Sequence, residues 1–141
     1  MANLVSRRQI TIEWGHCDPA GIAFNSRFFE FFDWSTWQLF ESALGMRPAE
    51  FVKVFGIVLP LVDAKARFLK PAKFNDLVDI VSEVIEFRRS SFDVQHRMWI
   101  DGTLAVEGSE TRVWASPNPI DPLKLKSMPI PAAVIERFRV T

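Results

Sequence analysis

The sequence predicts an α+β fold in which one antiparallel sheet of five strands curls around a single long helix. Three observations predict it. A helical pattern over about residues 25–44 is apolar around most of its circumference, so the rest of the chain must enclose this helix. Four segments with strand character follow the helix, and one precedes it. Short turn-forming stretches join the later strands, which is typical of antiparallel pairing.

The first strand is expected over residues 8–14. Ile10, Ile12 and Trp14 alternate there with polar residues, and a period of two indicates a strand with one buried face. The heptapeptide GHCDPAG at residues 15–21 is rich in turn formers and is therefore expected to be a loop.

The helix over residues 25–44 is the longest expected element, and Gly45 suits its C-terminal stop. A short helix over residues 48–54 is expected to begin at Pro48, and another covers residues 131–138. The four later strands are expected at about 56–70, 76–87, 91–100 and 103–115. Asp101-Gly102 is a strong signal for a two-residue hairpin, whereas the Pro-rich segment 116–128 is expected to be irregular. Residues 1–141 are predicted to form one domain.

Composition excludes several classes of partner and site. The 17 Lys and Arg balance the 17 Asp and Glu, so no bulk charge favours nucleic acid or an anionic membrane. Cys17 is the only cysteine, which rules out an intrachain disulfide and favours a reducing, cytoplasmic location. Two His and one Cys make a structural zinc site implausible, and no cofactor motif is found. No long apolar run indicates a signal peptide or a membrane-spanning helix.

Aromatic residues are abundant, with 13 Phe and 5 Trp. So many rings need either a core or a partner surface to cover them. We therefore predict that the chain forms a homo-oligomer through a face of the sheet or its edge.

One run of residues resembles a known family. A strand ending in Glu13-Trp14-Gly15 is followed by the run HCDPAGI at residues 16–22 and then by an aromatic-rich helix. This order resembles the hotdog-fold thioesterases, and among them the 4-hydroxybenzoyl-CoA thioesterase branch. Further matches to that branch are Asp33 within the helix, Gly56-Ile57-Val58, Phe87-Arg88-Arg89 and Ser91-Phe92.

The resemblance implies a hotdog fold. The expected homo-oligomer is a dimer or a tetramer, and a tetramer built as a dimer of dimers is the favoured form. It also implies hydrolysis of an acyl-CoA thioester without a cofactor. The implied acyl group is aromatic, such as 4-hydroxybenzoyl, with short or medium acyl chains as alternatives.

The resemblance assigns the catalytic role to Asp18. Its carboxylate would attack the thioester carbonyl or activate a water molecule, and the sequence does not choose between them. The local sequence alone favours another interpretation, in which the Asp-Pro pair starts a turn or caps a helix. The resemblance also assigns the oxyanion donor to the backbone N–H of Asn25 near the helix start. The Asn25 side chain is expected to act as an N-cap.

Four further residues are predicted to bind substrate. Asp33 lies inside the apolar arc of the helix, where a carboxylate needs a partner. It would bind a polar group of the acyl part, or form an ion pair at a subunit interface. Arg88 and Arg89 would bind the phosphates of CoA, with a solvated turn as the alternative. Ser91 would hold a water molecule near the reacting centre, or is an ordinary turn serine.

One alternative mechanism and two alternative functions are compatible with the sequence. His16 and Cys17 invite a cysteine mechanism, but adjacent residues in a loop usually point in different directions. A hotdog dehydratase acting on an acyl carrier would need a His general base. His96 would have to supply that base, but it is expected to be a core residue or a strand-pairing residue. A non-catalytic acyl-CoA-binding protein on the same scaffold is the third possibility, since a fold does not fix a function.

Overall fold

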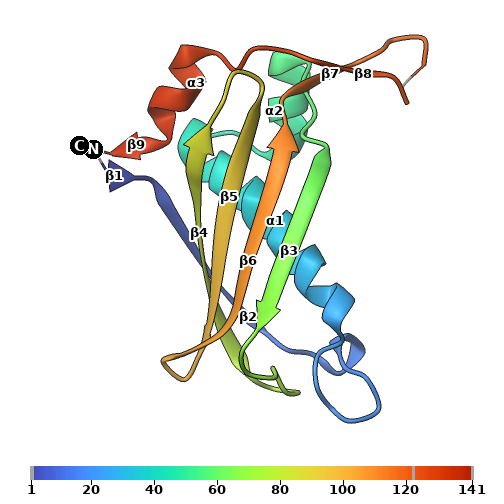
Figure 1. Ribbon diagram of the computed structural model, residues 1–141, viewed down its shortest axis with the longest axis vertical. Coiled ribbons are helices and arrows are strands. Elements are labelled where there is room, and N and C mark those ends of the chain that lie inside the picture. The colour runs from blue at the N-terminus through green and yellow to red at the C-terminus, as the bar shows by residue number, and fades with distance from the viewer. Residues whose placement is uncertain (1, 122, 141) are drawn as a thin grey trace.

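A five-stranded antiparallel sheet wraps one long helix in the computed structural model, which describes residues 2–121 and 123–140 (Figure 1). The strand order is β2-β4-β5-β6-β3, and every neighbouring pair is antiparallel. The strands are β2 (Val5–Thr11), β3 (Leu61–Phe68), β4 (Leu77–Phe87), β5 (Ser91–Ile100) and β6 (Thr103–Val113). The predicted architecture is confirmed, and it is the hotdog fold.

Helix α1 (Asn25–Leu44) has the predicted limits. It ends at Gly45, which has a φ of 70° and whose N–H bonds to the carbonyl of Glu41. Only a residue that tolerates this left-handed conformation stops a helix in this way without strain. Two shorter helices, α2 (Pro48–Phe55) and α3 (Ala132–Arg137), lie near the C-terminal end of α1 (Figure 1).

The hairpin between β5 and β6 also forms as predicted, because Asp101 and Gly102 have φ values of 50° and 74°. Positive φ at both central residues matches the right-handed twist of the paired strands.

The first strand ends three residues earlier than predicted. The backbone N–H of Glu13 bonds to Nδ1 of His16 at 2.9 Å, and the chain turns there into a short 3₁₀ helix, η1 (Trp14–His16). Trp14 consequently leaves the sheet and is 62% exposed. A side-chain contact three residues ahead therefore overrides the alternating pattern.

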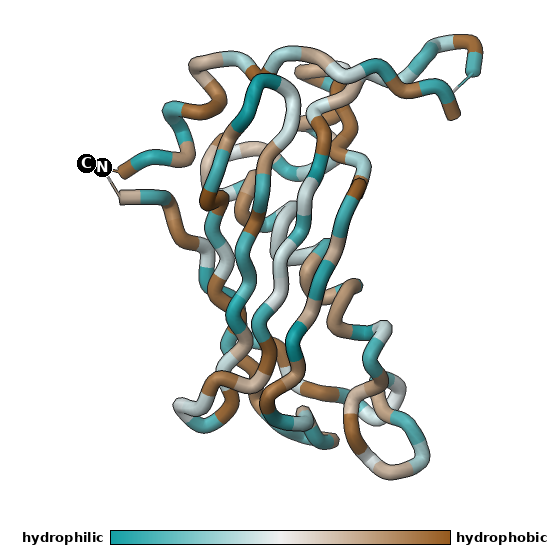
Figure 2. Tube along the Cα trace, viewed as in Figure 1, coloured by the Kyte–Doolittle hydropathy of each residue, from teal (hydrophilic) through white to brown (hydrophobic). Residues whose placement is uncertain are grey.

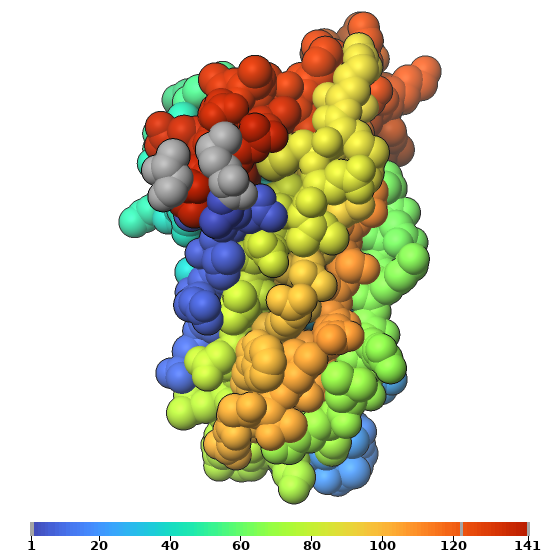
Figure 3. Space-filling view, turned by 60° about the vertical axis from the view of Figure 1, so that its left-hand side comes forward, coloured from blue at the N-terminus to red at the C-terminus, as the bar shows by residue number. Residues whose placement is uncertain are grey.

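Two short pairs of strands lie outside the five-stranded sheet. The segment predicted to be irregular forms a small hairpin of β7 (Ala115–Pro117) and β8 (Leu125–Ser127), so that prediction was wrong in part. Strand β1 (Ala2–Asn3) pairs with β9 (Arg139–Val140), which places the two ends of the chain side by side. Figure 1 shows this pairing, and Figure 3 shows an outer face of β4, β5 and β6 that none of the described helices covers.

The core consists of two apolar clusters with a polar layer between them. One cluster surrounds Phe40 and Phe92 near α2 and α3, and the other surrounds Phe32 and Met98 nearer the start of α1. His96 lies between them on the inward face of β5 and is fully buried. Hydrophobic and hydrophilic residues alternate along the central strands in Figure 2, as expected for strands with one buried face.

None of the described helices is long and apolar enough to cross a membrane.

Candidate functional site

Asp18 lies in a tight loop immediately before α1. Its backbone N–H bonds to the carbonyl of Ile22 at 2.9 Å, and an isolated bridge pairs Cys17 with Ala23. One carboxylate oxygen, Oδ1, accepts the N–H of Ala20 at 2.8 Å, so the local turn interpretation is realised. The other oxygen has no hydrogen-bond partner in the part of the chain that the structure describes. The half-buried carboxylate therefore keeps one oxygen available.

The start of α1 offers a free backbone donor beside this loop. Asn25 is the first helical residue, and the N-cap is Phe24, so the prediction that the Asn25 side chain caps the helix was wrong. The N–H of Phe24 bonds to the carbonyl of His16 at 2.9 Å and ties the helix start to the loop. The N–H of Asn25 has no partner among the described residues. A free N–H at a helix N-terminus favours a negatively charged oxygen.

A cavity of about 250 Å³ opens where the loop, the first turn of α1 and the end of β3 meet. Asn25 and Phe28 line it from the helix, and Phe68 lines it from β3. Ile22 and Ala23 line it from the loop that carries Asp18. Its walls are mostly apolar, which suits an acyl or aryl group with one polar centre. Asp18 is held next to this cavity through Ile22 rather than lining it.

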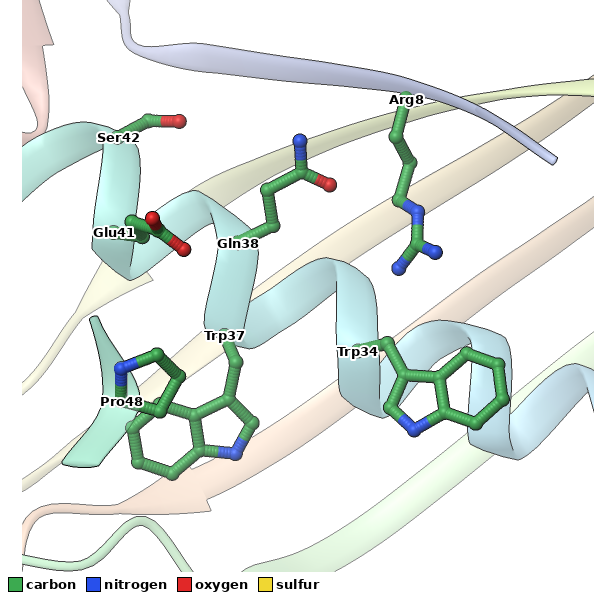
Figure 4. A pocket seen from close by; sticks show the side chains of 7 residues that line it. All are labelled: Arg8, Trp34, Trp37, Gln38, Glu41, Ser42 and Pro48. Atoms are coloured by element: carbon green, nitrogen blue, oxygen red, sulfur yellow. The ribbon is translucent and has the colours of Figure 1, made fainter.

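A larger, open groove of about 750 Å³ lies on another side of α1 (Figure 4). Trp34 and Trp37 line it, and Arg8 reaches it from β2 with its guanidinium carbon 5.9 Å from the centre of the Trp34 ring. Burial lowers the pKa of Arg8. None of the predicted site residues lines this groove, so it is separate from the Asp18 site.

Asp33 forms an ion pair within its own chain. Its Oδ1 accepts Nη2 of Arg112 at 2.7 Å, and the Asp33 side chain is 44% exposed. Asp33 follows Asn25 by eight positions on α1, which is a rise of about 12 Å along the helix axis. A single chain therefore keeps Asp33 away from the cavity, and the predicted pairing is with Arg112 rather than across a subunit interface.

The polar layer around Arg112 was not predicted. Glu110 accepts Nη2 of Arg112 at 2.7 Å and Nε2 of His96 at 2.9 Å, and the hydroxyl of Thr36 also donates to it. Burial alone would raise the pKa of Glu110, but the bonds from His96 and Arg112 lower it to about 2. Glu110 is therefore a buried, ionised and fully bonded carboxylate.

A signal for this layer was present in the sequence. Glu110 and Arg112 are two residues apart on β6. By the period of two they share the inward side of the chain with the buried Val106 and Trp114. Two charged residues on the buried face of a strand need partners.

Arg88, Arg89 and Ser91 lie at the turn between β4 and β5, at the opposite end of the sheet from Asn25 (Figure 1). Within one chain the structure does not bring them to the Asp18 site. Arg88 forms two bonds with Asp93, at 2.7 and 2.9 Å, and donates Nε to the hydroxyl of Ser91 at 2.8 Å. These bonds raise the pKa of Arg88 and lower the pKa of Asp93. Arg89 has no ion pair among the described residues.

His16 and Cys17 do not form a catalytic pair in this arrangement. Nδ1 of His16 accepts the N–H of Glu13, and the thiol of Cys17 points to the carbonyl of the same residue at 3.5 Å. No group of three or more His, Cys, Asp or Glu with a metal-binding arrangement occurs among the described residues.

Comparison with known proteins identifies the family. The model of the thioesterase-like superfamily matches residues 12–138, and the chain belongs to this family. It is a thioester hydrolase with the hotdog fold.

Individual relatives cover nearly the whole chain. A 4-hydroxybenzoyl-CoA thioesterase from Pseudomonas sp. (strain CBS-3) is 32% identical over 143 residues, which cover 96% of this chain and 98% of that protein. A crystal structure of a 4-hydroxybenzoyl CoA thioesterase mutant, with Asn in place of Asp, complexed with 4-hydroxybenzoyl CoA, has a TM-score of 0.85 and 30% identity. It covers 96% of this chain and 99% of that chain. The structure of a gentisyl-coenzyme A thioesterase has a TM-score of 0.80 and 29% identity, covering 92% and 99%.

Proposed function

We propose that this protein hydrolyses an acyl-CoA thioester at the loop before α1, with Asp18 as nucleophile or general base. The observation that carries the proposal is the free carboxylate oxygen of Asp18, held beside a helix start whose first N–H is unbonded. The relatives named as CoA thioesterases support the same substrate class.

The chemistry follows from these two groups. The Asp18 carboxylate attacks the carbonyl carbon to form a mixed anhydride, the CoA thiolate leaves, and water hydrolyses the anhydride. Alternatively, the carboxylate takes a proton from the water that attacks. In both routes the carbonyl oxygen gains negative charge, and the N–H of Asn25 at the helix N-terminus stabilises it.

An aromatic acyl group is the substrate that we propose. Phe28 and Phe68 line the cavity and provide flat apolar contacts. Two relatives are named for hydroxylated aromatic substrates, 4-hydroxybenzoyl and gentisyl CoA. Asp33 is the proposed acceptor for a ring hydroxyl, because its Oδ2 has no partner among the described residues.

We also propose that the site is completed by a second copy of the chain. Strand β3 ends the sheet, and its exposed edge carries Leu61, Val62 and Phe68, which are 47%, 60% and 46% exposed. An unpaired apolar edge strand favours pairing with another strand. A two-fold axis would pair β3 with its copy in antiparallel fashion.

This pairing would unite residues that one chain keeps apart. Leu61 is in register with Arg112, which holds Asp33, whereas Phe68 at the other end of β3 lines the cavity. Antiparallel pairing brings the Leu61 end of one copy to the Phe68 end of the other. The partner subunit's Asp33 would then approach the cavity beside Asp18. The proposed assembly is a tetramer made of two such dimers, and sedimentation measures its mass.

At the far turn, Arg89 is the better candidate for the CoA phosphates, because Asp93 and Glu86 already neutralise Arg88. Ser91 would hold a water molecule through its hydroxyl, which already accepts a hydrogen bond from Nε of Arg88.

A dehydratase is less well supported. Its His base must reach the acyl chain, but His96 is fully buried and Nδ1 of His16 is bonded to the backbone of Glu13.

One assay separates the three activities. Free thiol is measured over a panel of CoA esters with wild type and Asp18→Asn side by side. We expect wild type to release thiol and the variant to release very little. Enoyl product without thiol would indicate a dehydratase. Tight CoA-ester binding without turnover would indicate a binding protein.

A further inference from the structure

Asp33 is the exposed end of a chain of polar contacts that starts deep in the core. We propose that Arg112 is a positioning residue, which fixes the direction of the free Asp33 oxygen and so sets the ring position at which a substrate hydroxyl is recognised. This inference rests on the proposed role of Asp33 as acceptor for the acyl group.

The Arg112 guanidinium is held from three directions. Nη1 donates to the carbonyl of Leu59 at 2.9 Å, and Nη2 donates at 2.7 Å both to Glu110 and to Asp33. These acceptors come from the segment before β3, from β6 and from α1. A planar fork with three acceptors on separate elements has one orientation.

The far side of Arg112 is equally fixed. Glu110 is bonded to His96 and Thr36, and Nδ1 of His96 lies 2.7 Å from the hydroxyl of Ser82. All four of these side chains are buried. Phe32 stacks on the His96 ring at 4.9 Å with only 6° between the planes, which prevents the ring from turning. Arg112 therefore cannot follow Asp33 if the helix side chain moves, so Asp33 must conform to Arg112.

Arg112 is not placed for the best satisfaction of its own donors. Its Nε is buried and has no acceptor among the described residues. An unsatisfied buried donor is destabilising, so an arginine present for stability alone would be expected to use it. The arrangement instead directs Nη2 toward the half-exposed Asp33, as expected where a local rule is broken at a functional site.

The consequence concerns selectivity between isomers. A carboxylate anchored through Oδ1 presents Oδ2 in one direction, so it accepts a hydroxyl at one ring position better than at its neighbour. A carboxylate without the anchor rotates and accepts either. Arg112 should therefore control discrimination between 3-hydroxybenzoyl and 4-hydroxybenzoyl CoA. It should not control the general preference for a hydroxylated ring over a bare one.

The test compares kcat/KM for benzoyl, 3-hydroxybenzoyl and 4-hydroxybenzoyl CoA in the full-length oligomer. Wild type should discriminate between the two hydroxy isomers by about tenfold, which corresponds to the net free energy of about one hydrogen bond. Arg112→Lys keeps the charge but not the fork, and the isomer ratio should fall to within about threefold while the hydroxyl preference persists. Asp33→Ala should abolish the hydroxyl preference itself.

Ser35→Ala is the matched control, because it removes a buried hydroxyl that has no hydrogen-bond partner among the described residues and so does not hold Arg112. It should leave the isomer ratio unchanged. If Arg112→Lys does not fold, the double variant Glu110→Gln/Arg112→Gln removes both buried charges together, which a core tolerates better than removing one. It should lose the isomer ratio in the same way.

The outcomes separate this inference from the proposed function. An isomer ratio that survives in the Arg112 variants, or that is absent in wild type, overturns the positioning role while hydrolysis by Asp18 stands. A hydroxyl preference that survives Asp33→Ala overturns both the recognition role of Asp33 and this inference. No thiol release from wild type overturns the proposed hydrolysis.

Discussion

Two carboxylates of this protein lie in opposite surroundings. Asp18 is half-buried on a loop, and one of its oxygens accepts a single backbone N–H while the other has no partner among the described residues. Glu110 is 2% exposed, and both of its oxygens are bonded by His96, Thr36 and Arg112. A carboxylate that reacts must keep an oxygen free, whereas a carboxylate that holds a core together must leave none. The two regions should therefore respond in opposite ways to the same isosteric change from acid to amide.

The largest effect is expected at the loop. Asp18→Asn should reduce thioester turnover by about a thousandfold, because an amide neither attacks the carbonyl nor accepts the proton of water. The amide oxygen can still accept the N–H of Ala20, so the free energy of unfolding should change by less than about 0.5 kcal/mol. Single-turnover thiol release and urea unfolding measure the two quantities. A variant that loses stability in proportion to activity would contradict the contrast.

Glu110→Gln should show the reverse. Glu110→Gln removes the buried one of the two carboxylates that neutralise Arg112 and leaves only the half-exposed Asp33, so we expect a loss of about 3 kcal/mol, or about 10 °C in melting temperature. Hydrolysis of unsubstituted benzoyl CoA per folded molecule should stay within about twofold, since Glu110 does not reach the cavity. Glu107→Gln on the same strand is the control, because Glu107 faces away from the core and should change stability very little. Equal losses of stability in Glu110→Gln and Glu107→Gln would show that the buried carboxylate stabilises the protein no more than an outward-facing one.

The loop and the helix limits were readable from local sequence, whereas the layer was not. Gly45 and Asp101-Gly102 adopt the backbone conformations that their residue types favour, so α1 and the β5–β6 turn end where predicted. Glu110 and Arg112 lie on the buried face of β6, and the period of two makes that visible. Their bonding partners Asp33 and His96 lie on other elements, α1 and β5. Only the packed structure brings these residues together.

The errors have the same origin. Trp14 leaves the sheet because His16 bonds the backbone of Glu13, a contact that competes with the strand ladder. The arginine turn was predicted without Asp93, which lies on the next strand and binds Arg88. Contacts of side chains across strands decide both cases, and propensities along the chain do not contain them.

Stability in acid provides a further difference between the regions. The pKa of Glu110 is lowered from 4.5 to about 2, so folding favours its ionised form. The corresponding stability is fully present above about pH 4.5 and is lost as the pH falls toward 2, for a total of about 3 kcal/mol. Asp93 has a lowered pKa as well and shifts stability in the same direction, but it is more exposed. Urea unfolding at pH 7, 4.5 and 3 should therefore show a shallower acid slope in Glu110→Gln. If stability falls with pH equally in wild type and Glu110→Gln, groups other than Glu110 cause the acid sensitivity.

Stability should depend on the packing of Phe32 beside the polar layer nearly as strongly as on Glu110. A Cβ at Gly108 would overlap Cζ of Phe32, whose ring stacks on His96. Gly108→Ala should therefore displace that ring and destabilise the protein by about 2 kcal/mol. Ser109→Ala, one residue further on the opposite face of β6, should be nearly neutral in thermal unfolding. A neutral Gly108→Ala would mean that Phe32 can move without disturbing the layer.

The smallest effect is expected at the turn between β4 and β5, where two neighbouring arginines repeat the contrast between a bonded and a free charge. Arg88 is bonded to Asp93, Glu86 and Ser91, whereas Arg89 has no ion pair among the described residues. Arg89→Ala should raise KM for CoA esters about threefold at low salt, and the difference should vanish as salt screens the phosphates. Arg88→Ala should change KM less, because its charge is already neutralised. A larger KM effect for Arg88→Ala would show that the substrate displaces Asp93, and the bonded arginine would then be the one that binds phosphate.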